Sequence, residues 1–259
     1  MICANSKRKP RIFLVQVLAC GGWQCDEGVC SNHNECYYFG GPSGNAWTPA
    51  PSMTRNRFNF MLAYLPHVGD PTGPRTAVTI GYGAQSEWLE MDTEEWVGYY
   101  NLPNANWWGL SCLVQYNNRI YHVKDTVEEL NAVTWSVSDL STPPDRLLRP
   151  GTCVMTTING NDGIFTRQGY FYDLTDNKWT RKAFPDFDPI GDYPNSIFLY
   201  QGRPTIFGNT VCDALGECEN KEIIQYNADT DSWSKVGDML QSRTYHTAIP
   251  VPRSMCDLL

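Results

Sequence analysis

The chain has 259 residues, a formal net charge of −8 and a hydrophobic share of 42%. This acidity argues against binding to nucleic acid, because the phosphate backbone repels a negatively charged surface. No apolar run approaches the roughly 18 residues that a membrane-spanning helix needs. The 9 Trp, 14 Tyr and 10 Phe favour strands, so we expect an all-β protein.

Four basic residues open the chain: Lys7, Arg8, Lys9 and Arg11. We interpret residues 1–11 as a solvated basic leader. The apolar run Ile12–Cys20 then fits either a buried strand or the core of a signal peptide. We favour the strand because the repeat described next needs one here. The repeats would then fill residues 12–252 and leave residues 253–259 as a tail.

Tryptophans mark an internal repeat. Trp47 is followed by Met53 and Arg57, and Trp233 is followed at the same spacing by Met239 and Arg243. Upstream, three segments of equal length each end in a tryptophan after a polar turn, which is typical of a hairpin. These segments are Leu89–Trp96, Tyr172–Trp179 and Tyr226–Trp233.

Strand-like runs occupy equivalent places between the tryptophans. Trp47, Trp96, Trp135, Trp179 and Trp233 stand 39 to 54 residues apart, close to the period of about 40–50 residues of propeller blades. The runs, in chain order, are Phe58–Leu65, Ala77–Gly81, Leu110–Tyr116, Arg119–Val123, Thr152–Ile158, Gly163–Thr166, Asn195–Tyr200, Arg203–Phe207 and Tyr245–Val251.

On these motifs the chain resembles the kelch-repeat family of β-propellers, without the BTB domain found in ubiquitin-ligase adaptors. The family's glycine pair after the second strand of a blade is matched by Gly21–Gly22. The third unit, around Val133–Leu148, has no well-placed fourth-strand tryptophan. Counting strands gives about five four-stranded antiparallel blades, with Tyr245–Val251 completing the sheet that begins at Ile12–Leu18. A six-bladed or truncated propeller is the alternative.

The resemblance implies that loops on one face bind a protein or peptide partner. These loops include Thr54–Arg57, Asn101–Trp108 and Leu240–Tyr245. An arginine fork suits carboxylates, and exposed aromatic residues often anchor interfaces. The alternative is that the arginines only tie down turns; if they bind, Arg57→Ala and Arg243→Ala should leave the melting temperature nearly unchanged. The expected partner-binding residues are Arg55, Arg57, Trp107, Trp108, Arg243 and Tyr245.

Ten cysteines are many for a reducing compartment. The pairs Cys25–Cys30 and Cys212–Cys218 lie close in sequence and are the disulfide candidates, while Cys20 and Cys36 flank the first pair. Reduced thiols or a zinc site are the alternatives. Disulfides would favour an extracellular location over a cytoplasmic one.

No catalytic motif accompanies the four histidines, and no phosphate-binding glycine loop precedes a helix. We therefore expect no enzyme activity, no cofactor and no metal site. The leading hypothesis is a protein-interaction module. The alternatives are a secreted, disulfide-stapled propeller that binds an extracellular ligand or glycan and, remotely, a copper radical oxidase of the galactose oxidase type, which shares the kelch architecture.

Overall fold

The structure is a computed structural model of the whole chain, and every regular element it describes is a strand. It describes residues 17–26, 29–39, 46–57, 60–66, 75–80, 85–90, 93–101, 112–124, 126–144, 153–184, 197–208 and 221–240. Within these ranges no helix is long and apolar enough to cross a membrane.

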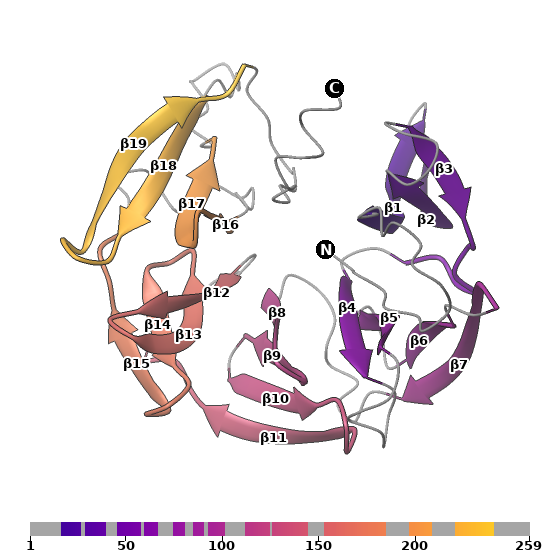
Figure 1. Cartoon of the computed structure of the whole chain (residues 1–259), viewed down its shortest axis with the longest axis horizontal. Helices are drawn as coiled ribbons and strands as arrows, with labels where there is room; N and C mark the ends of the chain where they lie inside the picture. The colour runs from indigo at the N-terminus through magenta and orange to yellow at the C-terminus, as the bar shows by residue number, and fades with distance from the viewer. Residues whose placement is uncertain are drawn as a thin grey trace, which may run out of the picture. The chain divides into compact units, whose positions relative to one another are not determined.

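Five antiparallel sheets follow one another along the chain, each built from consecutive strands (Figure 1). The first contains β1 (Val17–Asp26), β2 (Val29–Phe39) and β3 (Trp47–Ala50), and the second β4 (Met61–Pro66), β5 (Arg75–Ile80), β6 (Gln85–Glu90) and β7 (Glu95–Asn101). The third contains β8 (Cys112–Tyr116), β9 (Arg119–Val123), β10 (Val127–Asn131) and β11 (Ser136–Ser141). The fourth contains β12 (Cys153–Ile158), β13 (Asn161–Thr166), β14 (Tyr170–Asp173) and β15 (Lys178–Arg181), and the fifth β16 (Ile197–Tyr200), β17 (Arg203–Phe207), β18 (Glu222–Asn227) and β19 (Ser232–Asp238).

The first sheet has three described strands, as the repeat count predicts. The segment expected to complete it, Tyr245–Val251, lies outside the described residues. The strand expected at Ile12–Leu18 is found from Val17 onward, and residues 12–16 also lie outside the described part.

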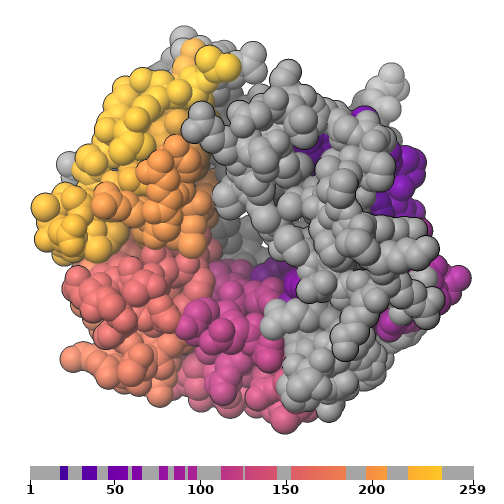
Figure 2. All heavy atoms as spheres, viewed as in Figure 1, coloured from indigo at the N-terminus to yellow at the C-terminus, as the bar shows by residue number. Residues whose placement is uncertain are grey.

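The structure divides into two compact units. One contains Met1–Gly109, Asn131–Val137 and Val251–Leu259, and the other contains Leu110–Leu130 and Ser138–Pro250. In the second unit, apolar side chains fill the space between successive sheets, for instance Ile164 and Tyr172 against Cys112 and Val114. Figure 2 shows the fourth and fifth sheets, in salmon to yellow, lying against one another, and β12 contacts β16 there.

The hairpins that end in tryptophan share one backbone geometry. The residue two places before the tryptophan has a positive φ in three sheets: 57° at Glu94, 52° at Asn177 and 46° at Asp231. Asn and Asp tolerate this left-handed conformation better than most residues.

The same geometry explains the third sheet, whose repeat lacks a well-placed tryptophan in the sequence. Trp135 has a φ of 51° and stands at the left-handed position of the hairpin, so Val137 takes the place that Trp96 and Trp179 hold elsewhere. The indole of Trp135 instead packs against Trp88, with ring centroids 5.6 Å apart. The third sheet is therefore a regular blade, and its tryptophan stands two residues before the position that Trp96 and Trp179 occupy in their sheets.

Two of the repeat tryptophans tie their sheet to the segment that follows the preceding sheet. The indole N–H of Trp96 donates to the carbonyl of Pro51 at 2.8 Å, and that of Trp233 donates to the carbonyl of Ala183 at 2.9 Å. In the second case Asp231 also accepts from the backbone N–H of Ala183 at 2.8 Å. The tryptophans thus act as structural anchors between successive sheets.

Replacing Trp96 or Trp233 by phenylalanine should lower the free energy of unfolding by about 1 kcal/mol, because a partly buried hydrogen bond is lost while the ring is largely kept. Trp179→Phe is the matched control, since its buried indole nitrogen has no hydrogen-bond partner among the described residues. Urea unfolding of the three variants measures the difference. An equal loss in Trp179→Phe would show that ring size, and not the hydrogen bond, sets the cost.

Candidate functional site

The segment between β3 and β4 is the described part of the loop face predicted to bind partners. Its backbone is fixed at two points by the first sheet. Met53 N donates to the Asn34 carbonyl at 2.8 Å, and the Asn34 side-chain amide donates to the Met53 carbonyl at 2.7 Å. Further along, Arg57 N donates to the His33 carbonyl at 2.9 Å, and Gly22 N donates to the Arg57 carbonyl at 2.8 Å. The segment is therefore docked on β1 and β2 by four hydrogen bonds.

The glycine pair allows this docking. Gly21 has a φ of 62°, and a Cβ atom there would stand 2.6 Å from the Arg57 carbonyl oxygen and 3.0 Å from the Met53 side chain. No larger residue fits so close to another backbone. The two glycines that the kelch resemblance implies thus lie where β1 must allow the linker between β3 and β4 to approach closely.

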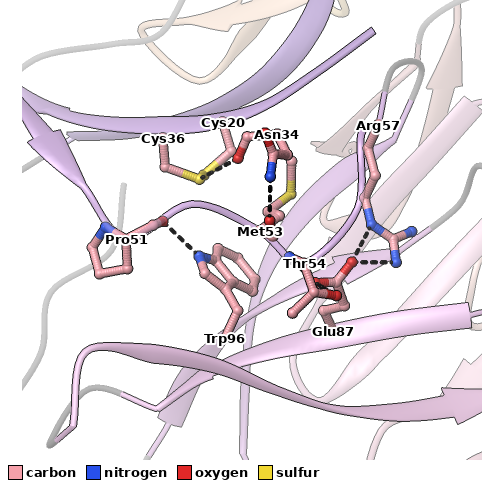
Figure 3. The surroundings of a disulfide bond; sticks show 9 residues. All are labelled: Cys20, Asn34, Cys36, Pro51, Met53, Thr54, Arg57, Glu87 and Trp96. Atoms are coloured by element: carbon pink, nitrogen blue, oxygen red, sulfur yellow. Dashed lines mark hydrogen bonds and ion pairs between the residues drawn. A yellow bond between two sulfur atoms is a disulfide. The ribbon is translucent and has the colours of Figure 1, made fainter.

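A buried carboxylate holds the other side of the linker. Glu87 lies in β6 and is fully buried. Its Oε1 accepts from Arg57 Nε at 2.9 Å and from Arg57 Nη2 at 2.8 Å. Its Oε2 accepts from Thr54 N at 2.7 Å and Thr54 Oγ1 at 2.8 Å, so both oxygens are saturated (Figure 3). The remaining guanidinium nitrogen, Nη1, donates to the Gln85 carbonyl at 2.8 Å.

The expectation that Arg57 is an exposed loop residue is wrong. Its side chain is 2% exposed and its guanidinium is committed to Glu87 and Gln85. The alternative reading of the sequence, in which the arginine ties down the turn, describes this geometry. We therefore expect the loss of Arg57 to lower the melting temperature, contrary to the prediction from sequence that Arg57→Ala leaves it nearly unchanged.

Four residues of the same linker are exposed: Ser52, Thr54, Arg55 and Asn56. The last three stand between two buried anchors, Met53 and Arg57, which are 1% and 2% exposed. Arg55 is thus the partner-binding candidate whose described geometry suits that role. Trp107, Trp108, Arg243 and Tyr245 lie outside the described residues, and their roles stay predictions.

Glu87 is the residue that sequence reasoning missed. An acidic residue directly before the buried Trp88 and Leu89 was the available signal, because a carboxylate inside an apolar strand requires a partner. The third sheet places a histidine, rather than an arginine, beside the equivalent carboxylate. Glu128 stands at the equivalent place in β10 and its Oε2 lies 2.7 Å from Nδ1 of His122. Burial lowers the pKa of His122, and Glu128 only partly opposes that shift.

Two disulfides are present among the described residues: Cys20–Cys36 and Cys112–Cys153. The first joins the two cysteines that flank the candidate pair Cys25–Cys30. The second joins β8 to β12 and was not predicted. Cys25 and Cys30 are backbone partners across β1 and β2, whereas Cys212 and Cys218 lie outside the described part, so both candidate pairings stay predictions. No group of three or more potential metal ligands is found among the residues described.

Comparison with known proteins places the fold but not a family. No protein-family model matches the chain, and no curated protein matches it. Solved structures do match, 163 chains in all. One of them, described as "Structure of YjhT", has a TM-score of 0.60 at 10% sequence identity and covers 86% of this chain and 81% of that chain. At this identity the likeness shows the fold alone, and together with the five successive sheets it confirms an all-β, five-bladed propeller.

Proposed function

We propose that the chain is a kelch-type propeller that binds a protein or peptide partner through the loops linking successive blades. The observation that carries the proposal is the linker of residues 51–57, in which three consecutive exposed polar residues lie between two deeply buried anchors. Backbone hydrogen bonds and Glu87 fix the conformation of this linker before any partner arrives. Such preorganisation reduces the entropy lost on binding.

Arg55 is the side chain through which the described part of this face would recognise a partner. Its guanidinium is always charged and can form paired hydrogen bonds with a carboxylate. The chain carries 20 basic and 28 acidic residues, so a basic side chain in a rigid loop is a distinct feature of its surface. We therefore expect the partner to present an acidic side chain or a chain terminus at Arg55.

A photo-crosslinking residue at position 56, which is exposed and adjacent to Arg55, should capture a partner that the same residue at position 95 does not. Position 95 is the matched control because Glu95, the first residue of β7, is also exposed but lies outside the linker of residues 51–57. Once the captured protein is purified, Arg55→Ala should weaken its binding at least tenfold, about 1.4 kcal/mol, while Glu94→Ala leaves it unchanged. Equal capture at both positions, or equal affinity of both variants, would contradict the proposal.

The two disulfides favour a second candidate, a secreted propeller that binds an extracellular ligand or glycan. Counting reactive thiols in protein purified without reductant separates the candidates. The disulfide-stapled form predicts that at least four of the ten cysteines resist alkylation in denaturant until a reductant is added. Reaction of more than six of the ten cysteines before reduction would rule out the disulfide-stapled, secreted form.

A further inference from the structure

Three side chains form a hydrogen-bonded row along β2. Ser31, His33 and Glu35 alternate along the strand, so they project from the same side of it. Ser31 and Glu35 are exposed, and the side chain of His33 is 33% exposed. The row is therefore open to solvent and to small molecules.

The two ring nitrogens of His33 contact different partners. Ser31 Oγ lies 3.2 Å from Nε2, and Glu35 Oε2 lies 3.1 Å from Nδ1. A carboxylate can only accept, so Nδ1 carries the proton and donates to Glu35. In the neutral ring Nε2 then accepts from the Ser31 hydroxyl. The pKa of Glu35 is lowered, first by its own backbone N–H and also by His33, which favours its ionised form.

The strand that carries the row is firmly held. His33 pairs with Gly22 in β1, and its carbonyl accepts from Arg57 N at 2.9 Å. Directly beyond Glu35, Cys36 is bonded to Cys20. The backbone beneath the three side chains is thus fixed on both sides, as a preorganised site requires.

We propose that this row is a hydrolytic site for small activated esters, with Ser31 as the nucleophile, His33 as the general base and Glu35 as a positioning residue. A nucleophile, a base within hydrogen-bond reach and a group that orients the base are the parts such chemistry needs. The proposal departs from the expectation from sequence that the chain has no catalytic residues, and it is independent of the proposed binding function.

The reaction balances with water as the second substrate. Ser31 Oγ attacks the acyl carbon while its proton moves to Nε2 of His33, and the ester C–O bond breaks as that proton passes to the leaving oxygen. Water then attacks the acyl group on Ser31 and gives a proton to His33. The acyl–serine bond breaks, the same proton returns to Oγ, and a carboxylic acid is released. General-base catalysis of this kind typically contributes about 10²–10⁴-fold in rate.

Hydrolysis of p-nitrophenyl acetate by the full chain, followed by absorbance, tests the proposal. We expect Ser31→Ala to reduce the protein-dependent rate at least tenfold, with Ser234→Ala, another exposed strand serine, as the matched control. A fluorophosphonate probe should label the Ser31 peptide, as read by mass spectrometry, and label neither Ser31→Ala nor the Ser234 peptide. Circular dichroism of each variant checks that the fold is intact.

The role of Glu35 has its own readout. Glu35→Ala should lower the rate, because Nδ1 of His33 loses the acceptor that orients the ring, and Glu35→Gln should restore part of the rate by accepting from Nδ1. A rate that is the same in Ser31→Ala and the parent protein, or absence of probe on Ser31, would overturn the proposal. A rate in Glu35→Ala equal to that of the parent protein, or no recovery of rate in Glu35→Gln, would remove Glu35 from it.

Discussion

Arg57→Met is expected to lower the free energy of unfolding by about 3–5 kcal/mol, since it leaves the fully buried carboxylate of Glu87 without its cation. For a domain of this size that loss corresponds to a fall in melting temperature of roughly 10 °C. Methionine keeps much of the side-chain volume, so the measured loss reports the charge and hydrogen bonds more than a cavity. Urea unfolding followed by tryptophan fluorescence gives the free energy directly.

Arg55→Met is the matched control for this prediction. Arg55 lies in the same linker but is exposed, so its removal should change the free energy of unfolding by less than about 0.5 kcal/mol. In the double variant Arg57→Met/Glu87→Gln the buried charge is gone as well. The double variant should therefore lose less stability than the two single variants added together. Equal small losses for Arg55→Met and Arg57→Met would show that the ion pair is not structural.

The repeat could be predicted from the sequence because its anchors are local. A tryptophan after a polar turn specifies a hairpin within eight residues, and the predicted Arg119–Val123 and Arg203–Phe207 match β9 and β17 residue for residue. The position of Val137 could not be recognised in this way. It depends on the left-handed backbone at Trp135, which places a large aromatic residue where Glu94, Asn177 and Asp231 stand in other sheets.

The candidate site was harder to predict because its partners are distant in sequence. The Arg57–Glu87 pair joins residues 30 positions apart, one in the β3–β4 linker and one in β6, and spacing from Trp47 identifies only the arginine. Sequence pattern therefore located the linker correctly but could not tell which of its side chains points inward. The register of Met53 and Arg57 against Asn34 and His33 decides this, and it leaves Arg55 outside.

The Cys112–Cys153 disulfide could have been predicted from the sequence only by aligning the repeats with one another. Each cysteine is the first residue of the first strand of its sheet, in β8 and β12, so the two occupy equivalent places in neighbouring blades. They are 41 residues apart and therefore do not resemble the short loops in which paired cysteines are usually sought. Both lie in one apolar cluster with Val114 and Ile164.

Removing this bridge, by Cys112→Ala/Cys153→Ala, should lower the free energy of unfolding by about 4 kcal/mol, because a loop of this length gains much entropy in the unfolded chain when it is no longer closed. The same change at Cys20 and Cys36, which are 16 residues apart, should cost about 3 kcal/mol. Chemical unfolding of both double variants, with and without reductant, measures these losses.

The control lies in how each protein responds to reductant. Reducing the parent protein should lower its stability by more than reducing Cys112→Ala/Cys153→Ala, since one bridge is already missing in that variant. A parent protein whose unfolding midpoint is the same with and without reductant would mean that these cysteines are not bonded in solution. In that case β8 and β12 would be joined by packing alone, and the case for an oxidising compartment would lose its structural basis.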